Sequence, residues 1–208
     1  MTKKKSSSSN RWLCEHFRDQ YVKIVHRSNI RSRAWFKLHA IQLNSNFLKS
    51  GMTVLDLGSS PGSWSEYAIK KVGKLGCVIA CDVLPMLPVK NVTFFHGNVK
   101  EKFFLESLLV YLNCKTINVV MSDMAPNMTG HYSIDHIRAM FLSKLALNIS
   151  IKVLSTGGSL LVKSFYGQEF SQFIKDLRVI FSKVKIYKPN ASRDRSREVY
   201  ILASSLKT

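Results

Sequence analysis

The most informative stretch of this sequence is Val54-Leu-Asp-Leu-Gly-Ser-Ser-Pro-Gly-Ser-Trp-Ser65. Its apolar first half is typical of a buried strand, and its second half is typical of a turn that leads into a helix. Gly58 and Gly62 let the backbone pass close to a ligand, and the free N–H groups at the start of a helix suit a carboxylate or a phosphate. A dinucleotide site would need the pattern G-x-G-x-x-G, which this stretch lacks. The turn therefore argues against a dinucleotide-dependent dehydrogenase.

Outward from this stretch, strand-like and helix-length segments alternate. The strand-like runs are 53–57, 77–81, 92–95, 117–121, 159–163, 184–187 and 199–203, and the helical segments between most of them are 63–72, 100–112, 133–154 and 168–182. Crossover helices indicate parallel strands, whereas 188–198 shows no helical period, so we expect the last strand to run antiparallel. We predict an α/β fold, a Rossmann-like, mostly parallel seven-stranded sheet with its last strand antiparallel and helices on both faces. This architecture is associated with methyltransferases.

Length and charge limit the possible organisation and partners. The 208 residues suffice for one sizeable core, so we expect a single domain over 11–208 with a basic helical segment at 11–48, preceded by a flexible basic tail at 1–10. The net charge of +18 favours a polyanionic partner, although it could also reflect a merely soluble basic surface. An anionic membrane is disfavoured, because the sequence has no run of 18 apolar residues and no separate basic amphipathic helix.

The cysteines predict neither a metal site nor disulfides. Cys77 and Cys81 lie four residues apart in one expected strand, where the rise per residue separates them by roughly 13 Å, too far to share a zinc ion. Cys14 and Cys114 have no paired spacing. We expect reduced thiols, and no secretory signal at 1–10, which together favour a cytoplasmic location.

Polar residues at strand ends suggest an adenosine-shaped cleft. Asp82 ends the second expected strand, 24 residues beyond Gly58, where a carboxylate can accept both hydroxyls of a ribose. Asn98 follows the third strand. Each of these residues taken alone could equally be a helix cap, but their ordered occurrence along three strand ends favours a ligand site.

Four charged residues occupy positions where an ordinary fold needs none. Asp123 and Lys163 end the fourth and fifth strands, Glu198 opens the antiparallel last strand at the same edge, and Lys37 lies on the basic helical segment. Burial of Lys163 beside Lys37 would make its proton easier to lose, whereas Asp123 and Glu198 would orient it and act in the opposite direction on its pKa. Such a lysine can take a proton from a weakly acidic alcohol. The alternative is a pair of structural ion pairs.

The ordered residues Lys37, Asp123, Lys163 and Glu198 resemble the Lys-Asp-Lys-Glu tetrad of RNA 2′-O-methyltransferases. Further segments resemble the FtsJ/RrmJ-type ribosomal RNA methyltransferase family over essentially the whole chain. They are Arg11-Trp-Leu with Glu15-His-Phe, Ser32-Arg-Ala-Trp-Phe-Lys-Leu38, Met121-Ser-Asp-Met-Ala-Pro-Asn-Met128, Lys188-Pro, Ser192-Arg and Arg195-Ser-Arg-Glu-Val-Tyr-Ile201.

The resemblance implies transfer of a methyl group from S-adenosylmethionine to the 2′-oxygen of a uridine in the A loop of 23S ribosomal RNA, on the large ribosomal subunit. It implies that Lys163 is the proton acceptor and that the cofactor is bound by Gly62, Trp64, Asp82, Asn98 and Asp123. The sequence departs from the family pattern at Asn98, Ser60 and Ser63, where the family has Asp, Ala and Gly. We expect cofactor binding to survive, modestly weakened by the missing charge at Asn98.

A set of basic residues on the segments that flank the active edge predicts RNA binding: Arg31, Arg33, Lys188, Arg193, Arg195 and Arg197. A small-molecule methyltransferase has no need of them. Two further alternatives are a catalytically weak ribosomal RNA-binding assembly factor, which would be expected to have lost part of the tetrad, and an RNA 2′-O-methyltransferase with another target nucleotide. We expect a monomer, because no exposed apolar stripe demands a partner.

Overall fold

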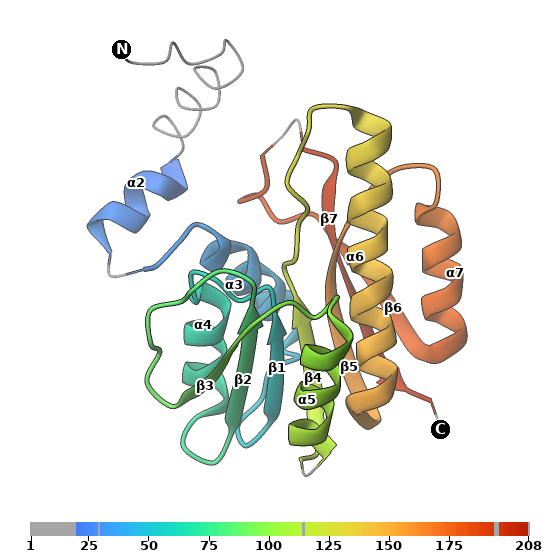
Figure 1. Cartoon of the computed structure of the whole chain (residues 1–208). Helices are drawn as coiled ribbons and strands as arrows, with labels where there is room; N and C mark the ends of the chain where they lie inside the picture. Colours follow the sequence, from blue (N-terminus) through green and yellow to red (C-terminus); the bar gives the residue numbers. More distant parts are fainter. Residues whose placement is uncertain (1–19, 29, 114, 194–195, 208) are drawn as a thin grey trace.

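The computed structural model describes residues 20–28, 30–113, 115–193 and 196–207. They form a seven-stranded sheet of order β3-β2-β1-β4-β5-β7-β6 (Figure 1). The strands are β1 (Thr53–Leu57), β2 (Cys77–Asp82), β3 (Val92–His96), β4 (Ile117–Ser122), β5 (Leu154–Phe165), β6 (Phe181–Tyr187) and β7 (Glu198–Leu206). β1 to β5 are parallel, and β7 runs antiparallel to both β5 and β6. The predicted fold class is therefore confirmed. The predicted tail at 1–10 lies outside the described residues.

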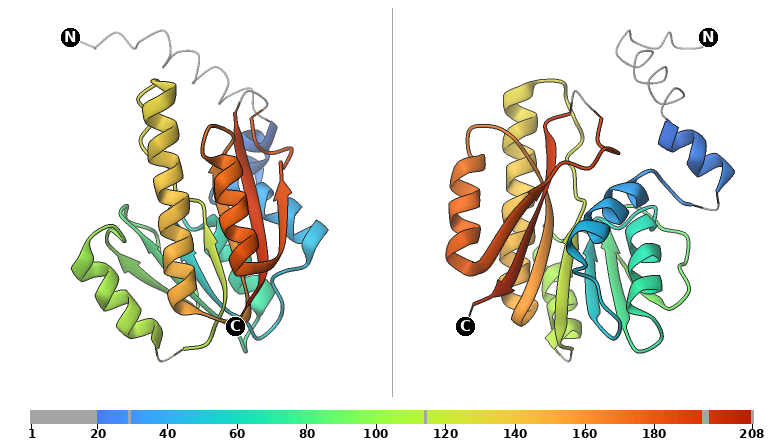
Figure 2. Two further views of the ribbon diagram at one scale, coloured as in Figure 1. Left: turned by 90° about the vertical axis from the view of Figure 1, so that its right-hand side faces the viewer. Right: turned by 180° about the vertical axis from the view of Figure 1, so that it is seen from behind.

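Helices cover both faces of the sheet. They are α2 (Gln20–Arg27), α3 (Ala34–Ser45), α4 (Ser63–Val72), α5 (Lys102–Asn113), α6 (Tyr132–Val153) and α7 (Phe170–Ile180). α5, α6 and α7 pack on one face, and α3 and α4 pack on the other, as the view from behind in Figure 2 shows. The alternation of β1 explains how one strand serves both layers, because Val54 contacts the α3/α4 side while Leu55 and Leu57 contact the other.

The basic N-terminal segment differs from the continuous helix predicted over 11–48. Within the described residues it consists of two helices, α2 and α3, with a non-helical connection between them. The guanidinium of Arg31 donates hydrogen bonds to the carbonyl oxygens of Leu87 (2.6 Å), Pro88 (2.7 Å) and Pro61 (3.1 Å). These long-range bonds hold the connection against the body of the protein, so tertiary contacts override the local helical pattern here.

β5 extends beyond the predicted run 159–163 at both ends. It begins at Leu154, directly after α6, and its pairing with β4 contains a register shift. At the other end it continues to Phe165, which pairs with Glu198, while Lys163 pairs with Tyr200. The prediction that Lys163 is the last residue of its strand is therefore wrong. Lys163 lies two residues before the end of β5, directly opposite Tyr200 of β7.

β6 also begins earlier than predicted. α7 ends at Ile180 rather than near residue 182, because Phe181 pairs with Leu206 of the long strand β7. Among the described residues, Cys77 and Cys81 are free thiols and no group of three His, Cys, Asp or Glu side chains is arranged to hold a metal ion. No described helix has the length and apolar character needed to cross a membrane.

Candidate active site

A cavity of about 470 Å³ lies at the carboxyl edge of the sheet, where β1, β2, β3 and β4 end, and we call it the cofactor cavity. Carboxyl ends of parallel strands meet at one edge, which is the usual place for a ligand in such sheets. Three of the five predicted cofactor-binding residues, Asp82, Asn98 and Asp123, line it together with Gly58. The other two, Gly62 and Trp64, do not line this cavity.

The carboxylate of Asp82 is fixed by two backbone donors. Oδ2 accepts a hydrogen bond from the N–H of Ser60 (2.8 Å), and Oδ1 accepts one from the N–H of Leu84 (2.8 Å). Each oxygen keeps a further lone pair, since a carboxylate can accept about four hydrogen bonds. Asp82 is therefore held in place while it can still accept a pair of hydroxyls from the cavity.

The turn between β1 and α4 needs its two glycines. Gly58 and Gly62 have φ angles of +76° and +102°. A Cβ on Gly58 would lie 2.7 Å from Cγ of Met124, and one on Gly62 would lie 3.1 Å from the guanidinium of Arg31. Any larger residue would combine an unfavourable backbone conformation with steric overlap.

The two serine departures from the family pattern are accommodated. Ser63 is the first residue of α4 and is not among the residues with positive φ, so this position does not require glycine. Its hydroxyl lies 2.7 Å from that of Ser32. Ser60 donates its hydroxyl to the carbonyl of Pro85 at 3.1 Å. Both serines thus stabilise the turn instead of obstructing it.

Two of the predicted cofactor residues have structural contacts. Trp64 is buried, and its indole N–H donates to the carbonyl of Ala34 (2.9 Å), so only its backbone N–H at the start of α4 is suited to a ligand. Asn98 lines the cofactor cavity, but its Oδ1 already accepts a hydrogen bond from the N–H of Lys100 (3.1 Å). The cap and the ligand interpretations of Asn98 are therefore compatible, because an amide oxygen has two lone pairs.

The four tetrad residues, which are distant in the sequence, lie together in the structure. Nζ of Lys163 lies 3.2 Å from Oδ1 of Asp123 and 3.1 Å from Oε2 of Glu198. Nζ of Lys37 donates to Oε1 of Glu198 at 2.6 Å. α3, β5 and β7 each supply one residue and Asp123 directly follows β4, so a single cluster replaces the two separate ion pairs of the alternative interpretation.

Sequence reasoning missed two members of this cluster. The hydroxyl of Tyr200, which is fully buried, donates to Oδ1 of Asp123 (2.8 Å) and accepts from Nζ of Lys37 (3.2 Å). The hydroxyl of Ser192 donates to Oε1 of Glu198 (2.9 Å). Tyr200 could have been found, because it lies two residues beyond Glu198 and therefore on the same face of a strand. No sequence signal placed Ser192.

Within the cluster, the attraction between opposite charges outweighs the effect of burial on the pKa of each group. Burial alone would lower the pKa of Lys163, but the nearby carboxylates of Asp123 and Glu198 outweigh it and raise that pKa above its ordinary value. Burial alone would likewise raise the pKa of Glu198, but Lys163 and Lys37 lower it to about 2. The carboxylates of Asp123 and Glu198 thus outweigh burial at Lys163 and favour the charged form of its amine.

A second cavity of about 300 Å³, which we call the substrate cavity, adjoins the first. Its lining includes Lys37, Lys163 and Glu198, together with Arg33, Arg193, Ser196 and Phe165. Ala125 lines both cavities, and Asp123 of the cofactor cavity is paired with Lys163 of the substrate cavity. The lysine amine therefore lies where the two cavities meet.

Five of the six predicted RNA-binding residues are described by the structure, and they fall into two groups. Arg31, Arg33 and Lys188 bond to backbone carbonyls: Arg31 as described above, Arg33 to Ala191, and Lys188 to Ser196 and Glu198. Arg33 and Lys188 hold the segment beside the substrate cavity, whereas Pro61, Leu87 and Pro88, to which Arg31 bonds, do not line that cavity. Arg193 lines that cavity, and the exposed Arg197 has its guanidinium 4.3 Å from the ring centre of Tyr132. Arg195 lies outside the described residues.

Comparison with known proteins agrees with this geometry. Residues 30–206 match the family of FtsJ-like methyltransferases. The chain is 70% identical, over the full length of both proteins, to ribosomal RNA large subunit methyltransferase E of Buchnera aphidicola subsp. Baizongia pistaciae. It is 53% identical to the protein of the same name from Buchnera aphidicola subsp. Schizaphis graminum, over 98% of this chain and 99% of that one.

Solved structures show the same fold. A crystal structure described as a ribosomal RNA methyltransferase of Plasmodium falciparum superposes with a TM-score of 0.74 at 28% identity, over 85% of this chain and 98% of that one. Human methyltransferase-like protein 13 in complex with SAH superposes with a TM-score of 0.59 at 12% identity, over 82% of this chain and 81% of that one. The second similarity concerns the fold alone.

Proposed function

Since the chain belongs to the FtsJ-like methyltransferase family, we propose that it transfers a methyl group from S-adenosylmethionine to the ribose 2′-hydroxyl of a uridine in the A loop of 23S ribosomal RNA. The observation that carries the proposal is the position of Lys163. Its amine lies between two adjoining cavities and is held by two carboxylates, that of Asp123 directly after β4 and that of Glu198 in β7. This arrangement suits a reaction in which a hydroxyl in one cavity attacks a group held in the other.

The residues around the cofactor cavity fit S-adenosylmethionine. Asp82 would accept the ribose hydroxyls, Asn98 would face the adenine, and Asp123 would lie toward the reacting end. At the start of α4, the Gly62 turn and the backbone N–H of Trp64 would bind the carboxylate of S-adenosylmethionine. The bound cofactor supplies an electrophilic methyl group.

Within the proposed reaction, Lys163 acts on the proton of the attacking hydroxyl. As the 2′-oxygen takes the methyl group that the bound cofactor would supply, the bond from this group to sulfur would break and leave the neutral thioether, and the hydroxyl proton would pass to Nζ of Lys163 in its neutral form. Asp123 and Glu198 orient this amine, while Lys37 and Tyr200 position the two carboxylates. Because the charged form of the amine is favoured, only the small neutral fraction can accept the proton.

RNA is the substrate that best suits the substrate cavity and its surroundings. The chain carries 31 Lys and Arg residues against 13 Asp and Glu, a balance that favours a polyanion. Arg193 and Arg33 line the substrate cavity itself. We propose that the enzyme acts in the cytoplasm on the large ribosomal subunit, and its monomeric state stays a prediction.

The structure separates two arginines that sequence reasoning grouped together. We expect Arg197→Glu to raise the KM for RNA without changing cofactor affinity, because its exposed guanidinium lies over the ring of Tyr132 and lines neither the cofactor cavity nor the substrate cavity. Arg31→Glu should weaken cofactor binding as well, because Arg31 bonds to Pro61 in the glycine turn. Calorimetric titration with S-adenosylmethionine and RNA steady-state kinetics test both variants. Equal cofactor affinity in the two variants would contradict the anchoring role of Arg31.

The proposed function is tested by mapping 2′-O-methylation along ribosomal RNA from cells with the protein, without it, and with a Lys163→Ala variant in its place. We expect one uridine of the A loop to lose its methyl group in the last two. Loss of 2′-O-methylation at a different nucleotide would identify that nucleotide as the target and contradict the assignment to the A loop. Unchanged methylation at every position would contradict RNA as the substrate.

A further inference from the structure

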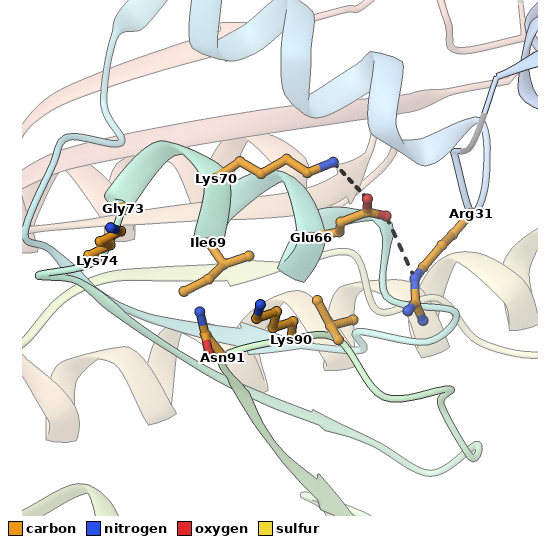
Figure 3. Close-up of a pocket in the computed structure, with 9 residues that line it drawn as sticks. Arg31, Glu66, Ile69, Lys70, Gly73, Lys74, Lys90 and Asn91 are labelled. Atoms are coloured by element: carbon orange, nitrogen blue, oxygen red, sulfur yellow. Dashed lines mark hydrogen bonds and ion pairs between the residues drawn. The ribbon is translucent and has the colours of Figure 1, made fainter.

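A third cavity, of about 480 Å³, runs along the flank of α4, and we call it the α4 groove (Figure 3). Its lining consists of Arg31, Glu66, Ile69, Lys70, Gly73, Lys74, Val89, Lys90 and Asn91. Glu66, Ile69 and Lys70 share one face of α4, and Gly73 and Lys74 follow directly after the end of the helix. None of the described residues of this groove lines the cofactor cavity or the substrate cavity.

The α4 groove is strongly basic. Its single carboxylate, Glu66, accepts a hydrogen bond from Lys70 (2.7 Å) and lies 3.6 Å from Nε of Arg31. Figure 3 shows these two cations on either side of the carboxylate. Lys74 and Lys90 are exposed, and within the described part of the chain they form neither an ion pair nor a hydrogen bond. Two cations therefore remain available to an anionic ligand.

Arg31 connects this groove to the active site. Its guanidinium bonds to Leu87 and Pro88, which precede Lys90 in the same loop, so it fixes the wall that carries this lysine. Arg33, two residues further along the chain, lines the substrate cavity. Two residues span at most about 7 Å. A single RNA strand could therefore pass from the substrate cavity, across the segment from Arg33 to Arg31, and into the α4 groove.

We propose that the α4 groove binds backbone phosphates of the RNA strand outside the target nucleotide, an inference that rests on the proposed function. Lys74 and Lys90 are exposed point charges on long side chains, and this suits phosphates contacted without regard to sequence. A specific small anion would instead need several directional polar groups that converge on it. The groove thus extends the RNA footprint along α4 and supplies affinity without sequence information.

The test compares two double variants that remove the same charge. Lys74→Gln/Lys90→Gln alters the groove, and Lys183→Gln/Lys185→Gln alters two exposed lysines of β6, at the opposite edge of the sheet from β3. The dissociation constant for 23S ribosomal RNA transcribed in vitro is measured over a range of salt concentrations. We expect the logarithm of the dissociation constant to rise less steeply with the logarithm of the salt concentration in the groove variant than in the β6 control. The two slopes should differ by about 1.4 to 1.8, which corresponds to two lost phosphate contacts.

The rate at saturating RNA distinguishes this inference from the proposed function. The groove variant should keep its single-turnover rate of methyl transfer within about twofold of the parent, because neither lysine lines the cavities that hold the reacting groups. If the parent transfers methyl groups but the RNA dissociation constants of the two double variants depend equally on salt, the role of the α4 groove is overturned and the proposed function is not. Absence of methyl transfer by the parent on this RNA and on isolated large subunits would overturn the proposed function.

Discussion

Replacement of Lys163 by alanine should lower the single-turnover rate of methyl transfer by roughly 10² to 10⁴, the usual range for general-base catalysis. The loss follows from removal of the amine where the cofactor and substrate cavities meet. Cofactor and RNA affinity should stay close to those of the parent, because Lys37 still pairs with Glu198 and Tyr200 still bonds to Asp123. Rapid-mixing assays with both ligands saturating measure the chemical step directly.

A matched control comes from Lys144, whose amine pairs with Glu169 away from both cavities. Lys144→Ala removes the same side chain and should leave the rate unchanged. If Lys163→Ala keeps more than about a tenth of the parental rate, Lys163 has no part in proton transfer and proximity is the main effect.

The pH dependence of the parental rate follows from the charge balance around Lys163. The pKa of Lys163 is raised above the ordinary lysine value, so only a small fraction of the amine is neutral at neutral pH. Each increase of one pH unit raises that fraction about tenfold. We expect the rate to rise with pH without levelling off below about pH 9. The apparent pKa belongs to the coupled cluster. Glu198→Gln removes one of the two carboxylates that raise the pKa of Lys163. The pH–rate profile of this variant should therefore shift to lower pH.

The second large effect is expected from Asp82→Ala, which should weaken S-adenosylmethionine binding by about 100-fold or more. Two hydrogen bonds to a charged acceptor are each worth about 1.5–3 kcal/mol, and a factor of ten corresponds to about 1.4 kcal/mol. The variant also loses the bonds from Ser60 and Leu84 that fix the loops on either side of the cavity. Calorimetry measures the affinity.

Two comparisons separate ligand contact from loop stability at this position. Asp176→Ala removes a half-buried carboxylate on α7, which accepts a hydrogen bond from Gln172 (2.8 Å), and should bind the cofactor as the parent does. Asp82→Asn keeps one acceptor oxygen and should fall between the parent and Asp82→Ala. If Asp82→Ala binds as tightly as the parent, the adenosine does not lie against Asp82.

Sequence alone was sufficient for the architecture and for grouping several polar residues at the carboxyl edge of the sheet. The strand at 53–57 and the helix at 63–72 have the bounds predicted for them, and the antiparallel last strand was expected from the short, non-helical connection before it. Asp82, Asn98 and Asp123 could be grouped because parallel strands end at one edge. These inferences need only local periodicity and the rules of strand connection.

The contacts of long side chains were decided by the tertiary structure. Lys37 and Glu198 are separated by 161 positions in the chain, and their 2.6 Å bond depends on how α3 packs across α4 and the sheet. The same holds for Arg31, which sequence reasoning assigned to RNA and the structure joins to Pro61, Leu87 and Pro88. A sequence pattern shows which residues are charged and which strand they end. Which partner each charge meets, and therefore whether the amine of Lys163 is charged or neutral, depends on distances that only the packed chain defines.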